Sequence, residues 1–429
     1  MKTSPYQLFA LPSGAEVALR PMDHVASVAV GLWIRAGGRY EPAAVVGISH
    51  FLEHLLFKGT RTRGCEQLKQ AIEGVGGSLN GFTAEEFTCY MAKVPARYGR
   101  RAIDILSEMA LHPSLAPNDV EKEREVILEE IRMYEDSPGQ YVHDLFNQLL
   151  WPNHPLGHVL SGTIDSVRGI GRGDLVRYWK QRYHHRNILA TCAGAFDPEP
   201  ATRQLRAAFA RPRRGAMRGF ARAPRPRRGP QVQVLRKTTE QTHLCLGMPA
   251  IGRSHPYRFA VELLHVMLGA NMSSRLFREV REKRGLVYEI GTQIKRYQDT
   301  GAFVVYAGCD PAKLVRTVET IAKELVRIRR ERVSAAELRR AKEFYRGQLL
   351  MGLEDTMEHM LWMGEQALTV GRIGAPQDLI HAIERVTPRQ IQEAARLLFV
   401  AERTFLAVVG PVSHEKTAAL RALCALRSS

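Results

Sequence analysis

Residues 50–54 read His-Phe-Leu-Glu-His, which places two imidazoles and one carboxylate within five residues. Apolar residues flank this segment and predict a buried helix that ends near Gly59. On a helix, His50 and His54 lie one turn apart and project from one face, where their ring nitrogens can fill two corners of a tetrahedral Zn²⁺ site. Glu53 stands beside that line and can reach a metal-bound water without displacing a ligand. The alternative interpretation is a pair of core histidines next to an exposed glutamate.

A catalytic zinc takes a third protein ligand and keeps one position open for water. The segment 121–131 is the best source, because it is rich in glutamate and carries an apolar stripe that predicts a helix packed on the core. Glu123 and Glu130 are seven residues apart, two helical turns, and share a face. One can bind the metal while the other holds a ligand histidine or a water. Most acids in such a run face solvent, so the spacing leaves the choice between the two open.

The helix of residues 50–54 is expected to belong to the first of two domains. Residues 211–230 combine prolines, glycines and arginines without a hydrophobic period, which predicts a linker between residues 1–210 and 231–429. Both halves show strands, then a run of helices, then another strand. This order predicts an α+β fold of two similar domains, each a mostly antiparallel sheet with helices packed on it. The second half lacks a copy of the motif, and its His265 is interpreted as a core histidine.

The composition is that of an ordinary globular protein: 429 residues, of which 45% are hydrophobic and 24% charged. No run of 18 apolar residues is present, so no membrane-spanning helix is expected. The six cysteines are scattered without a Cys-x-x-Cys pair, which argues against a disulfide scaffold and favours a reducing compartment. No apolar segment typical of a secretory signal follows Met1. A cytoplasmic location, in a bacterium, is therefore expected.

The net charge is +17, and its distribution is uneven. Between Arg211 and Arg228 lie eight arginines and no acidic residue. Such a stretch can bind polyanions or acidic partners, or it can be a solvated surface. A nucleic-acid-binding protein is the alternative from a different class, but no helix-turn-helix, RNA-recognition or zinc-finger pattern accompanies the arginines.

Over nearly its whole length, the sequence resembles the pitrilysin family of zinc peptidases, the inverzincins. It is most similar to the two-domain members: bacterial processing-protease-like proteins and the β-subunit of mitochondrial processing peptidase. The resemblance is carried by residues 50–54, by Glu130, and by the segments 77–90, 123–131 and 268–288.

Position by position, the resemblance implies that His50, His54 and Glu130 bind one Zn²⁺ per chain. It implies that Glu53 is the general base and that Glu123 is an acid held close to the ligands. The helical phase shared by Glu123 and Glu130 agrees with this choice of ligand.

The resemblance also implies where a peptide would bind. Asn80 and Gly81 match an edge strand that takes up substrate as an added β-strand, through backbone hydrogen bonds. In the second half, Arg281 matches a residue that holds a substrate carbonyl, and Tyr288 matches a donor to the developing oxyanion. The two domains would face each other as a clamshell.

The function implied is that of a zinc-dependent metalloendopeptidase that hydrolyses extended peptides or unfolded protein segments inside an enclosed chamber. Single-length members pair, so a homodimer or a heterodimer with a related subunit is expected. One alternative is a catalytic subunit that is active only with a non-catalytic partner. Another is a catalytically silent structural homologue, against which the intact motif argues.

Overall fold

The computed structural model describes residues 5–211, 215, 219–225 and 229–425. They form two compact units, each assembled from segments that are not contiguous in sequence. Unit 1 comprises Met1–Ile131, His158–Ala221 and Met351–Ala375. Unit 2 comprises Arg132–Gly157, Arg222–Leu350 and Pro376–Ser429.

Unit 1 is built on a six-stranded sheet in the order β1-β2-β6-β3-β5-β4. Its strands are β1 (Gln7–Ala10), β2 (Glu16–Pro21), β3 (Ser27–Ile34), β4 (Ser78–Thr83), β5 (Thr88–Pro95) and β6 (Ile188–Gly194). Its helices are α1 (Ile48–Leu56), α2 (Cys65–Glu73), α3 (Gly99–Leu111), most of α4 (Pro117–Asp136), α6 (Ile164–Gly169), α7 (Arg172–Arg182), α8 (Pro198–Ala208) and α12 (Thr356–Val370).

Unit 2 is built on a five-stranded sheet in the order β7-β11-β8-β10-β9. Its strands are β7 (Gln231–Arg236), β8 (Thr242–Ala250), β9 (Val287–Arg296), β10 (Gly301–Cys309) and β11 (Phe405–Gly410). Its helices are α5 (Pro138–Leu150), α9 (Arg258–Leu268), the π-helix η6 (Phe277–Glu282), α10 (Leu314–Arg330), most of α11 (Ala335–Gly352), α13 (Pro376–Glu384), α14 (Pro388–Leu398) and α15 (His414–Ala425).

The two sheets repeat one topology. The order β2-β6-β3-β5-β4 in unit 1 corresponds strand for strand to β7-β11-β8-β10-β9 in unit 2. Each sheet has one parallel pair, β2 with β6 and β7 with β11, and its other neighbours are antiparallel. The expected fold of two similar α+β domains is therefore confirmed, with mixed sheets in which antiparallel pairing dominates.

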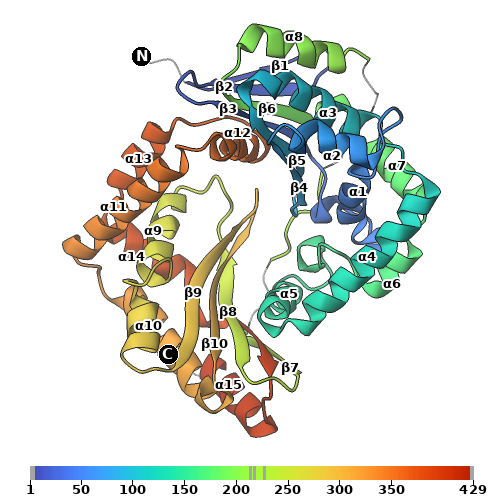
Figure 1. The fold of residues 1–429 in the computed structure, drawn as a ribbon. Helices are drawn as coiled ribbons and strands as arrows, with labels where there is room; N and C mark the ends of the chain where they lie inside the picture. Colours follow the sequence, from blue (N-terminus) through green and yellow to red (C-terminus); the bar gives the residue numbers. More distant parts are fainter. Residues whose placement is uncertain (1–4, 212–214, 216–218, 226–228, 426–429) are drawn as a thin grey trace. The chain divides into compact units, whose positions relative to one another are not determined.

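The central strands of unit 1 are buried because helices cover both faces of the sheet. In β3, Val30 and Leu32 point into a core shared with α1, whereas Ala29 and Trp33 point into a second core on the opposite face. This alternation is the two-residue period of a strand with two apolar faces. The second core is closed by α12, which contributes Met360 (Figure 1).

Two glycines let α12 approach the sheet closely. A Cβ on Gly364 would lie 2.0 Å from the Trp33 ring, and one on Gly31 would lie 2.3 Å from Sδ of Met360. The ring N–H of Trp33 donates to Oγ1 of Thr191 on β6 at 2.9 Å. A helix from the second half of the sequence is thus an integral part of the unit 1 core.

One face of the unit 2 sheet is covered by α5, a helix from the first half of the sequence. Val142 and Phe146 of α5 share a core with Val304 and Phe405 of the sheet. A Cβ on Gly247 would lie 2.6 Å from the Phe146 ring, so glycine is required where this helix crosses β8. The proposed division of the sequence into domains at 211–230 stays a prediction. In space, unit 1 also contains α12, which follows this segment in the sequence, and unit 2 also contains α5, which precedes it.

The expected linker 211–230 lies partly outside the described residues, which omit 212–214, 216–218 and 226–228. Within its described part, the carbonyl of Ala221 accepts from Arg39 at 3.0 Å in unit 1. The N–H of Ala223 donates to Asp299 at 3.0 Å in unit 2.

The remaining expectations from composition concern membranes and cysteines. Among the described residues, no helix combines the length and the apolar character needed to cross a membrane. All six cysteines are free thiols, in line with their scattered spacing. The cytoplasmic location stays a prediction.

Candidate metal centre

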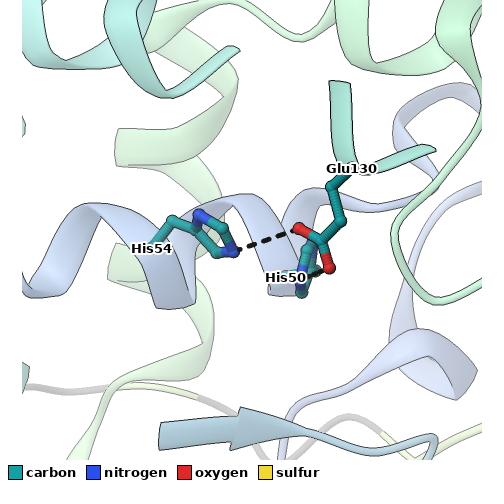
Figure 2. Close-up of side chains that lie close together, drawn as sticks. All are labelled: His50, His54 and Glu130. Carbon is teal, nitrogen blue, oxygen red and sulfur yellow. Dashed lines mark ion pairs between the residues drawn. The ribbon is translucent and has the colours of Figure 1, made fainter. Parts of the chain in front are cut away.

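The histidine motif lies on α1, which begins after Gly47 and is packed into the unit 1 core. Phe51, Leu52 and the two leucines at its end are fully buried. Burial of that apolar face fixes the rotation of the helix about its axis, so the two histidines one turn apart face α4 (Figure 2).

Three donor side chains converge from these two helices. Nε2 of His50 lies 3.7 Å from Oε1 of Glu130, and Nε2 of His54 lies 3.6 Å from Oε2 of the same carboxylate (Figure 2). One donor atom from each residue lies within 4.8 Å of the others. Zinc bonds of about 2.0–2.1 Å in a tetrahedron separate neighbouring donors by about 3.3 Å. The set therefore fits one shared zinc ion after small side-chain shifts.

This is the single group of three or more metal-ligating side chains found in the part of the chain that the structure describes. In unit 2, His265 instead has Nδ1 2.7 Å from Oγ1 of Thr292. Burial lowers the pKa of His265 to about 4. It sits in its unit as a hydrogen-bonded, largely buried histidine.

Glu123 contacts the ring nitrogen of His54 that does not face Glu130. Its Oε2 lies 3.2 Å from Nδ1 of His54, and its Oε1 lies 2.6 Å from Nζ of Lys58. A protonated Nδ1 that donates to Glu123 leaves the lone pair of Nε2 directed toward Glu130, where it could bind a metal ion. Lys58 was not anticipated from the sequence, although it follows His54 by four residues, the spacing of one helical turn.

The two histidines differ in their electrostatic surroundings. Burial and the neighbouring His54 lower the pKa of His50 to about 3, so its imidazole is neutral at pH 7 and able to bind a metal. Burial also opposes charge on His54, but the hydrogen bond to Glu123 and the nearby carboxylate of Glu130 outweigh it and raise its pKa.

Glu53 is buried beside the ligands, with 9% of its surface exposed. Its Oε2 accepts a hydrogen bond from Oγ1 of Thr83 at 2.7 Å. Burial raises the pKa of Glu53, against the hydrogen bond from Thr83 and the charge of His54. Thr83 was missed at the sequence level, because no local pattern links the end of a strand to a helix 30 residues earlier.

Asn80 and Gly81 lie on β4, which is the edge strand of the unit 1 sheet, as expected. In this sheet β4 pairs with β5 alone, and Gly81 is opposite Tyr90. A Cβ on Gly81 would lie 3.0 Å from the Phe57 ring, so glycine allows the strand to pass close to the end of α1.

Arg281 and Tyr288 lie together in unit 2. The guanidinium of Arg281 is 5.6 Å from the centre of the Tyr288 ring and 4.7 Å from that of Phe277. Arg281 is part of the π-helix η6, an irregularity that occurs frequently at functional sites. Tyr288, the second residue of β9, has 74% of its surface exposed, which is unusual for a large aromatic side chain. The role of this pair toward a peptide stays a prediction.

Comparison with known proteins places this centre in a family. A family model described as insulinase, peptidase family M16, matches residues 16–164, and one described as the peptidase M16 inactive domain matches residues 169–345. An uncharacterized zinc protease of Streptomyces coelicolor is 37% identical over 418 residues, 96% of this chain and 90% of that protein. The chain belongs to the M16 peptidase family.

Another relative and two solved structures match over nearly the whole chain. An uncharacterized zinc protease of Bacillus subtilis is 32% identical over 403 residues, 94% of this chain and 98% of its own. A protease of Helicobacter pylori matches in fold with a TM-score of 0.89, 19% identity, and coverage of 95% of this chain and 100% of that one. A Pseudomonas fluorescens structure, titled as a peptidase M16 inactive domain, has a TM-score of 0.88 at 18% identity, covering 95% and 98%. The expected family is confirmed, and the chain is a metallopeptidase.

Proposed function

We propose that this M16 peptidase is a zinc-dependent endopeptidase with one Zn²⁺ per chain, held by His50, His54 and Glu130. The observation that carries the proposal is the convergence of their donor atoms from two helices, within 4.8 Å of one another. Two imidazoles and a carboxylate with a fourth position left for water are typical of a catalytic zinc site. The zinc-protease names of the relatives support the choice of metal.

The side chains around the ligands have the properties that peptide hydrolysis requires. A bound zinc would act as a Lewis acid on the scissile carbonyl and lower the pKa of water. Glu53 would take the proton of the attacking water and pass it to the leaving amine. Burial raises the pKa of Glu53, which makes its carboxylate a better proton acceptor. Thr83 holds one of its oxygens in place.

The substrate would bind as an extended peptide along the free edge of β4. Asn80 and Gly81 lie on that edge, where the N–H of Gly81 donates to Oδ1 of Asn80 at 2.8 Å, and a bound peptide would take the place of this contact. Affinity from backbone hydrogen bonds depends little on side chains, which fits cleavage of extended peptides or unfolded segments with broad sequence tolerance. Enclosure of the peptide in a chamber is part of the same proposal.

Arg281 and Tyr288 would act on the bound peptide from unit 2. Arg281 would hold a substrate carbonyl, and the exposed hydroxyl of Tyr288 would donate to the oxyanion that develops in the transition state. The closeness of the guanidinium to the Tyr288 ring supports their acting as a pair. A homodimer, or a heterodimer with a related subunit, completes the proposal.

Metal analysis combined with digestion of a mixed peptide pool tests this function. The purified chain should carry about one zinc and produce internal cleavages. His54→Ala should lose the zinc, whereas the matched variant His265→Ala in unit 2 should retain it. Full zinc content in His54→Ala would contradict the ligand assignment. A zinc-loaded chain that cleaves nothing would instead favour a catalytic subunit that needs a partner, or a silent homologue.

A further inference from the structure

A buried carboxylate lies at the N-terminus of the helix that carries both histidines. Oε2 of Glu41 accepts from the N–H of Gly47 at 2.7 Å, and its Oε1 accepts from the N–H of Ser49 at 2.8 Å. Gly47 has no side chain with which to cap the helix, so Glu41 satisfies two of the donors that a helix start leaves unpaired.

Holding a carboxylate at this position is costly for the fold. Glu41 is 6% exposed, and burial raises its pKa to about 7 even though the Gly47 N–H and the hydroxyl and N–H of Ser49 act in the opposite direction. A serine or asparagine next to the helix would cap it with a neutral side chain. A buried charge is weak evidence for stability, and its presence therefore points to a role beyond stabilising the helix.

Two further contacts fix the same turn of α1. Oγ of Ser49 lies 2.7 Å from the hydroxyl of Tyr178 on α7, and Tyr178 is buried. A Cβ on Gly47 would lie 2.7 Å from the carbonyl oxygen of Ser161, so the backbone at Gly47 lies close to the loop that contains Ser161. The first turn is thus held from Glu41, from α7 and from the loop at Ser161, and the ligand His50 follows directly.

The helix that supplies the third ligand contacts the other end of α1, through Glu123 with His54 and Lys58, and also has an anchor outside α1. Arg124 of α4 donates to the carbonyl of Ile170 at 2.8 Å, in the segment between α6 and α7. Glu41 accepts from Gly47 and Ser49, whereas Arg124 donates to Ile170, so the two helices have different anchors. Loss of the Glu41 anchor would therefore act first on His50 at the start of α1, while α4 keeps its contacts with Ile170 and with the end of α1.

We infer that Glu41 is a positioning residue of the metal centre, which sets the separation between the α1 histidines and Glu130 without touching the ion. The inference rests on the proposed zinc site. Metal sites tolerate deviations of about 0.2 Å in ligand distances, so a small shift of one helix end is enough to weaken binding. Glu41 acts on the zinc through two backbone N–H groups and one turn of helix.

The test compares Glu41→Gln with the wild type in the full-length chain at pH 8. Glutamine has the same size, but its amide group would face one of the two N–H donors, so one anchor bond is lost. We expect the Kd for zinc, measured by competition with a chelator, to rise about 10- to 100-fold. With cobalt in place of zinc, the visible absorption spectrum should change, and kcat should fall more than KM changes.

The matched control is Thr191→Val, on the sheet face opposite α1. It removes the acceptor for Trp33 in the core closed by α12, so it should lower the unfolding temperature. Its zinc Kd, cobalt spectrum and kcat should equal those of the wild type. The contrast separates positioning of the metal centre from a general loss of stability.

Wild-type zinc affinity and kcat in Glu41→Gln would overturn the inference and leave the proposed function intact. If the proposed function fails, the wild type itself binds no zinc, which is a distinct result. If Glu41→Gln does not fold, Glu41→Asp decides the question, because it keeps the charge but shortens the reach by one carbon. A raised zinc Kd in Glu41→Asp supports the inference, and a wild-type Kd overturns it.

Discussion

His54 and Glu123 are joined by a 3.2 Å contact between Nδ1 and a carboxylate oxygen, and the other ring nitrogen of His54 faces Glu130 and the proposed metal position. The other oxygen of Glu123 binds Lys58 at 2.6 Å. Lys58 lies just beyond the end of α1, so the cation, the carboxylate and the ligand form one chain of contacts. The pKa of Glu123 is lowered, because hydrogen bonds from His54 and Lys58 outweigh its burial.

Replacing Lys58 with methionine should weaken zinc binding up to about tenfold, because Glu123 would lose the cation that keeps it charged and in place. Lys69→Met is the matched control, since Lys69 is exposed on α2 and away from the ligands. Zinc Kd values from chelator competition measure the effect. Equal Kd values for the two variants would show that Lys58 does not support the centre.

Glu53→Gln should keep one zinc and the wild-type unfolding temperature, because Thr83 can donate equally to an amide oxygen. Its turnover of peptides should fall by about 10²–10⁴, because an amide cannot take the proton of water. Glu66→Gln, an exposed change on α2, serves as the control. Peptidase assays on zinc-saturated protein give the comparison. Wild-type turnover in Glu53→Gln would exclude it as the base.

Tyr288→Phe should lower kcat by up to about 10² and leave the zinc content unchanged, because it removes one oxyanion donor. Arg281→Ala should mainly raise KM, since a grip on a carbonyl acts in both the ground and the transition state. Tyr257→Phe removes another hydroxyl from unit 2, one bonded to Glu393 at 2.9 Å, and should leave turnover unchanged. Steady-state kinetics that fail to distinguish Tyr288→Phe from Tyr257→Phe would return Tyr288 to a structural role.

A chain that ends at residue 210 should not fold stably, although it contains all three proposed ligands. It would lack α12, and the apolar face with Ala29 and Trp33 would be exposed to water. Co-expression with residues 211–429 should restore solubility, because that fragment supplies Met360 and the rest of the helix. Solubility and zinc content of each preparation measure this. Cooperative thermal unfolding of the short chain alone would contradict the prediction.

The pKa of Glu41 predicts a pH dependence of folding in the metal-free protein. Burial raises this pKa from 4.5 to about 7, so the folded state holds the proton more tightly than the unfolded state. The corresponding stability is complete below pH 4.5 and is lost as the pH rises to about 7. Relative to Glu41→Gln, the wild-type free energy of unfolding should fall by about 3 kcal/mol across this window.

Urea unfolding of both metal-free proteins at pH 5 and pH 8 measures this change. The Glu41→Gln variant lacks the titrating group, so at each pH it is the reference against which the wild-type free energy of unfolding is compared. A wild-type advantage that stays constant between the two conditions would contradict the raised pKa.

Local spacing was enough to predict the histidine pair and the repeated order of elements. A separation of four residues is one helical turn whatever surrounds it, so His50 and His54 had to share a face once their segment was helical. The apolar residues around them predicted that helix. The edge position of β4 was implied by the family resemblance, and the sheet order confirms it.

The contacts that complete the centre join residues far apart in the chain. Helical phase placed Glu123 and Glu130 on one face of α4. Which ring nitrogen of His54 each of them contacts, Nδ1 for Glu123 and Nε2 for Glu130, depends on how α4 packs on α1. Glu41 and Thr83 reach α1 through loops and a strand, and no local pattern encodes such contacts.

The sequence also did not predict that α5 packs in unit 2 and α12 in unit 1. The apolar residues of both helices indicate that they are buried but not against which sheet. Their place depends on surface complementarity at distant positions, where Gly364 admits Trp33 and Gly247 admits Phe146. Chain order thus predicts two similar units, while close packing between remote segments decides which residues each unit contains.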